Sequence, residues 1–388
     1  MTEELRPIVD LTDAEARRAL ILKWGTMPEG VLPAWVAEMD YALDPVVHDA
    51  VRRALDDGVT GYPTFDEDHA LGEAYAGFAG RHFGWEVAPE WVLPVVDVTA
   101  GVRVAIDVLS EDGPLVFPTP GYTPQFAVPE LTGRPRVDLP VDPDAERAEI
   151  DLDHLARLFA DGARTLLLTQ PHNPWGRVFT RAELEGVRDV VLRHGARVVS
   201  DEIHAPLALP GAKHVSYLDL EGTADHAVAV VAASKAFNTA GLRCAQIVVP
   251  DDASRQLLAD QPMARNDSWS PLGSVAAIAA YAHGDPWLAS LVERLDQLRT
   301  LLGTLLAEHL PEVRMRPLEA TYLVWLDARA YGHADPSAVA LEQGGVKLGP
   351  GHEYQHGLEG HARLNLATSP ERLTEIVRRL AQAWDWPA

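Results

Sequence analysis

Short apolar stretches alternate with longer segments of helical spacing through the first two thirds of the chain. The stretches 165–169, 197–200 and 227–231 are rich in Leu, Val and Ala, which is typical of strands covered on both faces. The segment that follows Thr180 carries Glu183 three positions on, a capping-box pattern that predicts a helix ending near residue 194. Strands that alternate with helices in this way predict a mainly parallel sheet with helices on both sides.

The other expected elements follow the same rules of spacing and capping. We expect further strands at 91–96, 114–117 and 244–249, and helices at 11–22, from 45 to about 57, 69–83 and 103–109. After residue 250 the pattern changes to long helical segments at 269–283 and 286–309, then strands at 322–326, 346–348 and 363–366, a helix from Pro336 and a final helix. This tail predicts a smaller α+β lobe. The expected division is an N-terminal arm at 1–44 that joins the small domain, a large domain at 45–283 and a small C-terminal domain at 284–388.

Composition and charge limit the kinds of partner and compartment. The chain has 388 residues, of which 47% are hydrophobic and 23% charged, as in globular proteins. No stretch reaches the roughly 20 apolar residues of a membrane span, and residues 1–10 lack the apolar core of a signal peptide. The single cysteine, Cys244, suits a reducing cytoplasm. The net charge of −24 argues against nucleic acid as a partner.

Lys235 is the first candidate for chemistry. It comes just after the expected strand 227–231, and ligands of open α/β sheets bind at the carboxyl ends of strands. A lysine with a lowered pKa can form a Schiff base with a carbonyl group. The neighbouring Ser234 and Arg243 could hold a phosphate, the hydroxyl as a donor and the guanidinium as a two-pronged clamp. The alternative is an ordinary loop lysine.

Three turns carry further candidates. The turn Thr99, Ala100, Gly101 and Val102 stands where the helix at 103–109 opens, and a helix N-terminus is an anion site. Tyr122 lies in a proline-rich turn, where its ring could stack on a planar cofactor or simply pack. Asn173 lies in a Pro-His-Asn-Pro turn and could donate a hydrogen bond in a cleft, or form an Asx turn without a ligand.

Two more segments have alternative interpretations. Asp201, Glu202 and His204 follow the expected strand 197–200 and could suggest a metal site. Adjacent strand residues point to opposite faces, however, so we expect no metal there and favour a buried Asp201 that faces a ring nitrogen. Residues 32–41 are short and aromatic, which indicates either an extended arm across a pocket or a strand packed on the core.

These motifs occur in an order that resembles the fold type I pyridoxal phosphate enzymes of the aspartate aminotransferase superfamily. The chain is most similar to the MalY/PatB group of carbon–sulfur β-lyases. That narrower resemblance covers nearly the whole chain and rests on six segments: 35–40 (WVAEMD), 171–179 (PHNPWGRVF), 201–204 (DEIH), 234–242 (SKAFNTAGL), 319–323 (EATYL) and 363–365 (RLN).

The resemblance implies a pyridoxal 5'-phosphate cofactor and a role for each matching residue. Lys235 would form the Schiff base and Asp201 would pair with the ring nitrogen. The remaining cofactor contacts would come from Asn173 at the ring hydroxyl, Tyr122 stacked on the ring, His204, and the phosphate ligands Ser234, Arg243, Ala100, Gly101 and Val102. Tyr62 would reach the phosphate of a neighbouring subunit, which implies a homodimer with shared sites. The small amino-acid substrate would be held by Arg363, which would clamp its α-carboxylate, and by Asn173, Trp35 and Ala37.

The reaction implied by the resemblance is α,β-elimination of L-cystathionine or a related L-cysteine S-conjugate to pyruvate, ammonia and a thiol. Lys235 would be the base, its pKa lowered by desolvation and by Arg243, and Tyr122 would assist thiolate departure. An aminotransferase would use the same residues, and a natural-product lyase or cyclase could share the scaffold. A binding protein without a cofactor is disfavoured by Lys235 and Asp201. His204 stands where the wider superfamily often has Tyr, and Glu38 where an Asp is more typical.

Overall fold

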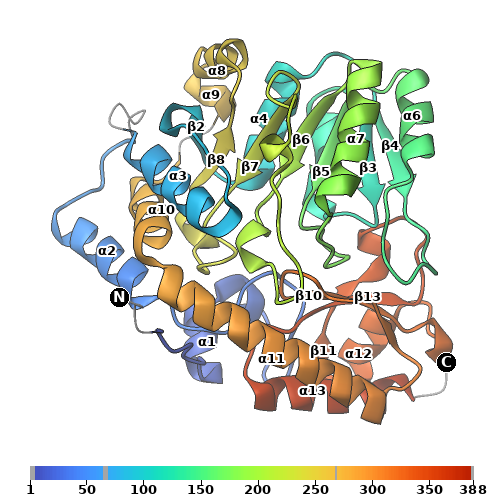
Figure 1. Ribbon diagram of the computed structural model, residues 1–388. Coiled ribbons are helices and arrows are strands. Elements are labelled where there is room, and N and C mark those ends of the chain that lie inside the picture. Colours follow the sequence, from blue (N-terminus) through green and yellow to red (C-terminus); the bar gives the residue numbers. More distant parts are fainter. Residues whose placement is uncertain (1–4, 64–68, 267–268, 386–388) are drawn as a thin grey trace.

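The structure is a computed structural model that describes residues 5–63, 69–266 and 269–385 (Figure 1). Its centre is a seven-stranded sheet in the order β2-β8-β7-β6-β5-β3-β4. The strands are β2 (Val92–Val95), β3 (Leu115–Thr119), β4 (Arg136–Pro140), β5 (Thr165–Thr169), β6 (Arg197–Asp201), β7 (Ala227–Val231) and β8 (Ala245–Val248). The pairs from β4 across to β7 are parallel, whereas β8 is antiparallel to both of its neighbours. The predicted mainly parallel sheet is therefore confirmed.

Both faces of this sheet are covered. Val228 and Val230 of β7 belong to a core under α4 (Val98–Leu109), while Ala227, Ala229 and Val231 belong to the larger core on the opposite face. Alternate residues of one strand thus enter two different cores, which explains the continuous apolar stretch in the sequence. The other helices of this part are α2 (Pro45–Asp56), α3 (Ala70–Phe83), α5 (Val128–Leu131), α6 (Leu152–Ala160), α7 (Arg181–His194), α8 (Asp252–Ala259), α9 (Met263–Asn266) and α10 (Pro271–His283).

A smaller lobe follows the long helix α11 (Asp285–His309), which runs across the lower part of the molecule in Figure 1. Its four-stranded antiparallel sheet has the order β12-β13-β10-β9, with β9 (Arg314–Met315), β10 (Leu323–Asp327), β12 (Gly349–Pro350) and β13 (His361–Asn365). The helices α12 (Pro336–Gly344) and α13 (Pro370–Trp384) pack on each other beside it.

The N-terminal segment contacts this smaller lobe. After α1 (Asp13–Ala19), the short strand β1 (Leu32–Pro33) pairs in parallel with β11 (Val346–Lys347). This pairing supports an N-terminal arm that joins the small domain, while the division of the chain at 44 and 283 stays a proposal. Residues 1–4, 64–68, 267–268 and 386–388 of these expected domains lie outside the described residues. In the described ranges, no helix is long and apolar enough to cross a membrane.

The structure corrects the predicted start of α4. The helix begins at Val98, not at residue 103, and Asp97 caps it by accepting a hydrogen bond from the Ala100 amide at 2.8 Å. The residues expected to precede the helix are therefore inside its first turns. Residues 32–41 combine both interpretations, since 32–33 form a strand while Val36, Ala37 and Glu38 line a cavity.

Candidate active site

A cavity of about 330 Å³ lies at the carboxyl ends of β5, β6 and β7. This is the edge of the sheet where an open α/β fold binds ligands. Eight residues selected from the sequence line it: Ala37, Tyr122, Asn173, Asp201, His204, Ser234, Lys235 and Arg243. Residues far apart in the sequence are thus brought together around one space.

Lys235 lies in the turn after β7 and its amine faces this cavity. The Nζ atom donates a hydrogen bond to the Ala37 carbonyl at 3.0 Å. Burial, and then the positive charge of Arg363, lower the pKa of Lys235 to about 8. The nearby carboxylates Glu38 and Asp201 oppose this shift. Arg363 is therefore the cation that lowers the pKa of Lys235, in place of the expected Arg243.

Asp201 ends β6 and is only 3% exposed. Its Oδ1 accepts from the Ile203 amide at 3.1 Å and its Oδ2 accepts from Gln125 Nε2 at 2.6 Å. Burial raises the pKa of Asp201 to about 6 against the effect of these two donors. Because burial disfavours the ionised form of Asp201, a cationic partner in the cavity would stabilise the carboxylate.

Glu202 does not share the Asp201 cavity. It accepts hydrogen bonds from Ser200 Oγ at 2.8 Å and from the Tyr217 amide at 2.9 Å, and it contacts His214 Nε2 at 3.2 Å. These contacts occupy its carboxylate in the protein interior. In the part of the chain that the structure describes, no three His, Cys, Asp or Glu side chains are grouped as a metal site.

Arg363 lies on β13 and is 4% exposed. One of its terminal nitrogens donates to Asn173 Oδ1 at 3.0 Å and the other to the Trp35 carbonyl at 2.6 Å. Its guanidinium lies over the Tyr354 ring, 4.9 Å from the centroid. The Nε atom is buried and has no hydrogen-bond partner among the described residues. A buried guanidinium with donors to spare fits an incoming carboxylate.

Two further side chains in the cavity have pKa values shifted by burial. Burial lowers the pKa of His204 to about 3, with Lys235 and Arg363 acting in the same direction, so the imidazole is neutral. Its Nδ1 is buried without a partner among the residues described. Burial also raises the pKa of Tyr122, against the charge of Arg363, so its phenol stays protonated at neutral pH.

The expected anion site falls within the first turns of α4, which starts at Val98. The Gly101 amide already donates to the Asp97 carbonyl at 2.9 Å, and a Cβ on Gly101 would lie 2.9 Å from Val230, so this glycine serves helix–sheet packing. Val98 and Thr99, instead of residues 100–102, line the cavity. Amides at the first positions of a helix have no partner inside it. The residues that fit a phosphate are therefore Val98 and Thr99.

Arg243 and Ser234 lie at the same end of the cavity. Arg243 pairs with the Asp97 carboxylate across the mouth, and more than half of its side chain is exposed. Because the guanidinium is a planar fork, it can bind a phosphate while it keeps one carboxylate contact. Ser234 adds a hydroxyl donor.

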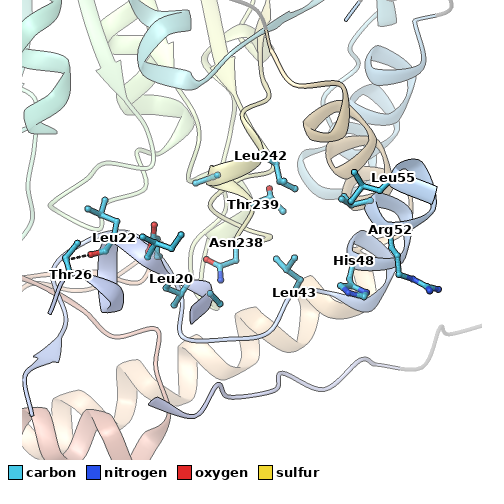
Figure 2. Close-up of a pocket in the computed structure, with 16 residues that line it drawn as sticks. Leu20, Leu22, Thr26, Leu43, His48, Arg52, Leu55, Asn238, Thr239 and Leu242 are labelled. Carbon is cyan, nitrogen blue, oxygen red and sulfur yellow. Dashed lines mark hydrogen bonds between the residues drawn. The ribbon is translucent and has the colours of Figure 1, made fainter. Parts of the chain in front are cut away.

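Tyr62 does not line the cavity of its own chain, and its side chain is 90% exposed. A second cavity of about 690 Å³ lies beside the first and shares Leu22, Glu38, Ala240 and Gly241 with it. Figure 2 shows its apolar side chains, which come from the segment after α1, from α2 and from the loop that precedes β8.

The residues present fit pyridoxal 5'-phosphate. An amine of lowered pKa suits an aldehyde, the Asp201 carboxylate suits a protonated ring nitrogen, and the first turn of α4 with Ser234 and Arg243 suits a phosphate. Sequence reasoning included Thr99 in the expected anion site but missed Gln125, and it missed Asp97 and Val98 just before that site. An Asp directly before an apolar helical segment is an N-cap signal that could have located Asp97 and Val98, whereas nothing in the sequence marks Gln125.

Comparisons with known proteins identify the family of the chain. Residues 30–380 match the family model "Aminotransferase class I and II". The chain is 38% identical to a putative cystathionine beta-lyase of Mycobacterium tuberculosis, over 97% of this chain and 98% of that protein, and 36% identical to the cystathionine beta-lyase of Corynebacterium glutamicum, over 96% and 98%. A crystal structure of a putative PLP-dependent beta-cystathionase from Corynebacterium diphtheriae superposes with a TM-score of 0.91 at 33% identity, over 97% and 98% of the two chains. The chain therefore belongs to the aminotransferase class I and II family, with the fold of the pyridoxal phosphate enzymes of fold type I.

Proposed function

We propose that the protein is a pyridoxal phosphate-dependent carbon–sulfur β-lyase that converts L-cystathionine or related L-cysteine S-conjugates to pyruvate, ammonia and a thiol. The relatives named cystathionine beta-lyase support this reaction. Those relatives favour elimination over amino-group transfer, which would use the same residues. The observation that carries the amino-acid chemistry is the convergence of the Lys235 amine, the Asp201 carboxylate and the Arg363 guanidinium, since Arg363 lowers the pKa of Lys235 and Asp201 raises it. These are the base, the ring partner and the carboxylate clamp that the reaction needs.

When bound, the cofactor supplies an electron sink for the charge that develops on the substrate Cα. Lys235 attaches the cofactor and, when free, removes the Cα proton; at a pKa of about 8, roughly a tenth of its amine is unprotonated at pH 7. Asp201 keeps the proton on the ring nitrogen. Tyr122, which lines the cavity and whose phenol stays protonated, would assist the departing thiolate.

The remaining residues bind and orient. Arg363 holds the substrate carboxylate, and the Trp35 carbonyl fixes one end of its guanidinium. Asn173 already accepts from Arg363 with its Oδ1, so its amide nitrogen is the group left to donate to the ring hydroxyl. Ala37 holds the Lys235 amine through its carbonyl. The neutral His204 also lines the cavity, and its Nδ1, which has no partner among the described residues, would be available to the bound cofactor.

The reaction is tested by incubating the cofactor-loaded protein with L-cystathionine in the absence of any keto acid, while pyruvate and free thiol are followed together. We expect equimolar pyruvate and thiol, because Cα deprotonation with a β-thiolate in place leads to elimination. The Lys235→Ala variant is the control for elimination without enzyme. If neither product forms until a keto acid is added, and a new amino acid then forms, the protein is an aminotransferase.

We further propose that two copies form a homodimer with shared active sites. Tyr62 is exposed on its own chain, and so are Ile21, Leu22 and Leu55 around the cavity of Figure 2. Exposed apolar groups of this size, adjacent to an active-site cavity, support an interface between subunits. In this arrangement, Tyr62 of one chain reaches the phosphate bound by the other.

Hybrid dimers test whether Tyr62 acts across the interface. Tyr62→Ala should weaken cofactor affinity by roughly tenfold, as expected for a hydrogen bond to a charged group. We expect co-expression of Tyr62→Ala with Lys235→Ala to restore activity at limiting cofactor, since one of the two sites in each hybrid then combines an intact Lys235 with an intact Tyr62. Activity no higher than that of the Tyr62→Ala protein alone would place Tyr62 outside the partner's site. Light scattering of the purified protein gives the subunit number independently.

The remaining proposals concern location and partners. We propose a cytoplasmic location. The single cysteine, Cys244, is buried and forms no disulfide, so the fold does not depend on an oxidising compartment. The partner for catalysis is a small amino acid, which suits a cavity of about 330 Å³.

A further inference from the structure

Gln125 is a buried polar residue that the reaction described above does not use. Its side chain is 2% exposed and donates from Nε2 to Asp201 Oδ2 at 2.6 Å. The other oxygen of Asp201 accepts from the Ile203 amide at 3.1 Å. Both oxygens of the carboxylate therefore accept hydrogen bonds from the protein. The Ile203 donor is a backbone amide, whereas the Gln125 donor is a side chain that a substitution can remove.

We propose that Gln125 is a positioning residue that orients the Asp201 carboxylate toward the ring nitrogen of the cofactor and keeps it an acceptor of that nitrogen's proton. This inference rests on the proposed pairing of Asp201 with the cofactor. A glutamine amide suits the task, because its NH₂ group donates a hydrogen bond and remains neutral across the pH range of the enzyme.

The charges around Asp201 show why such a donor matters. Burial raises the pKa of Asp201 to about 6, and Glu202, the next residue, raises it further, while the Ile203 amide, Gln125 and Lys235 lower it. The charge of Asp201 also contributes to the raised pKa of Tyr122, which lines the same cavity. Loss of the Gln125 donor would raise the pKa of Asp201 again, toward the pH at which the enzyme works. A protonated Asp201 would donate a hydrogen bond and could not stabilise a cationic ring nitrogen.

The backbone around Gln125 is fixed to the rest of the site. Gln125 lies in a short 3₁₀ turn, 123–127, and its amide donates to the Tyr122 carbonyl at 3.1 Å. The Gly121 amide donates to the Tyr354 carbonyl at 2.9 Å, and Thr123 Oγ1 donates to the Glu353 carbonyl at 2.8 Å. The turn that carries Tyr122 thus also aims Gln125 at Asp201.

The test compares two ligands on the cofactor-free protein: pyridoxal 5'-phosphate and its analogue with C–H in place of the ring nitrogen. Wild type should bind the natural cofactor more tightly, because only that ligand can pair with Asp201. Gln125→Leu should weaken binding of pyridoxal 5'-phosphate by roughly tenfold to a hundredfold, the range for a hydrogen bond to a charged group, and leave affinity for the analogue unchanged. The decline of cofactor affinity on acidification should also begin at a higher pH in the variant.

The matched control is Gln246→Leu, which removes another buried glutamine whose partners are Tyr281 and Cys244. It should keep the wild-type preference between the two ligands. If Gln125→Leu keeps that preference as well, the inference is overturned while the proposed function stands. If wild type itself binds both ligands equally, the pairing of Asp201 with the ring nitrogen is wrong and the proposed function loses that residue.

A second variant covers the case in which Gln125→Leu does not fold. Gln125→Met keeps the length of the side chain, but its thioether has no N–H group to donate to Asp201. We expect the same selective loss of affinity for pyridoxal 5'-phosphate, with thermal unfolding of the cofactor-free protein as the check on folding. An unchanged preference between the two ligands in this folded variant would also overturn the inference.

Discussion

Replacing Lys235 with alanine should abolish lyase turnover while the cofactor still binds noncovalently. The pKa of the amine is lowered to about 8, and the amine is held at the Ala37 carbonyl in the space where the substrate must enter. Loss of a general base lowers kcat by roughly a hundredfold to ten-thousandfold, and loss of the attachment point adds to this. Cofactor affinity should persist in part, because Asp201, Ser234 and Arg243 are unchanged.

The measurement combines steady-state kinetics with chemical trapping. Borohydride treatment of the loaded wild type should fix the cofactor on the peptide that contains Lys235, as seen by mass spectrometry, and the variant should carry none. Lys213→Ala is the matched control, because Lys213 is exposed and lies outside the cavity. Normal turnover in Lys235→Ala, or cofactor fixed on another lysine, would refute the assignment.

The pH dependence of this attachment follows from the pKa of the amine. Only the unprotonated amine attacks an aldehyde, so the attachment rate should fall as pH drops below about 8, the value set mainly by burial and by Arg363. Replacement of Arg363 should raise the pKa of Lys235 and move this fall to higher pH. Stopped-flow absorbance of cofactor added to the cofactor-free protein gives the profile.

Local sequence signals located the elements that carry the site. The strands β5 and β7 match the predicted stretches 165–169 and 227–231 residue for residue, and α7 begins after Thr180 with the predicted capping box. In each case the cause is local: a continuous apolar stretch for a strand between two cores, and a Thr–Glu pair for a helix start. The positions of Lys235 and Asp201 at strand ends follow from these elements.

Contacts between distant segments could not be predicted in the same way. Arg363 lowers the pKa of Lys235 because β13 of the smaller lobe brings its side chain to Asn173, in the loop after β5, and no spacing in the sequence predicts this approach. Gln125 meets Asp201 across 76 positions of the chain. The edge strand β4 was also missed, because its sequence, Arg136–Pro140, is polar and ends in proline.

Replacing Arg363 with alanine should weaken substrate binding by about 2 to 5 kcal/mol, the cost of truncating one partner of a buried charge pair. This corresponds to a roughly thirtyfold to several thousandfold loss in kcat/KM. The guanidinium is buried, is oriented by the Asn173 side chain and the Trp35 carbonyl, and keeps an Nε donor that has no partner among the described residues. Arg363→Lys should recover only part of the loss, because an ammonium cannot bind a carboxylate with two parallel hydrogen bonds.

A substrate analogue separates loss of the clamp from general damage to the site. An S-conjugate of cysteamine lacks the carboxylate, so it should bind wild type and Arg363→Ala with similar weakness, whereas the L-cysteine conjugate should distinguish the two proteins. The control Arg378→Ala removes an exposed arginine of α13 and should leave both ligands unaffected. If Arg363→Ala weakens binding of the two ligands equally, Arg363 supports the shape of the site through Asn173 and Trp35, and the carboxylate is held elsewhere. A selective loss for the carboxylate ligand means that Arg363 sets the direction in which the amino acid enters, with its Cα beside Lys235.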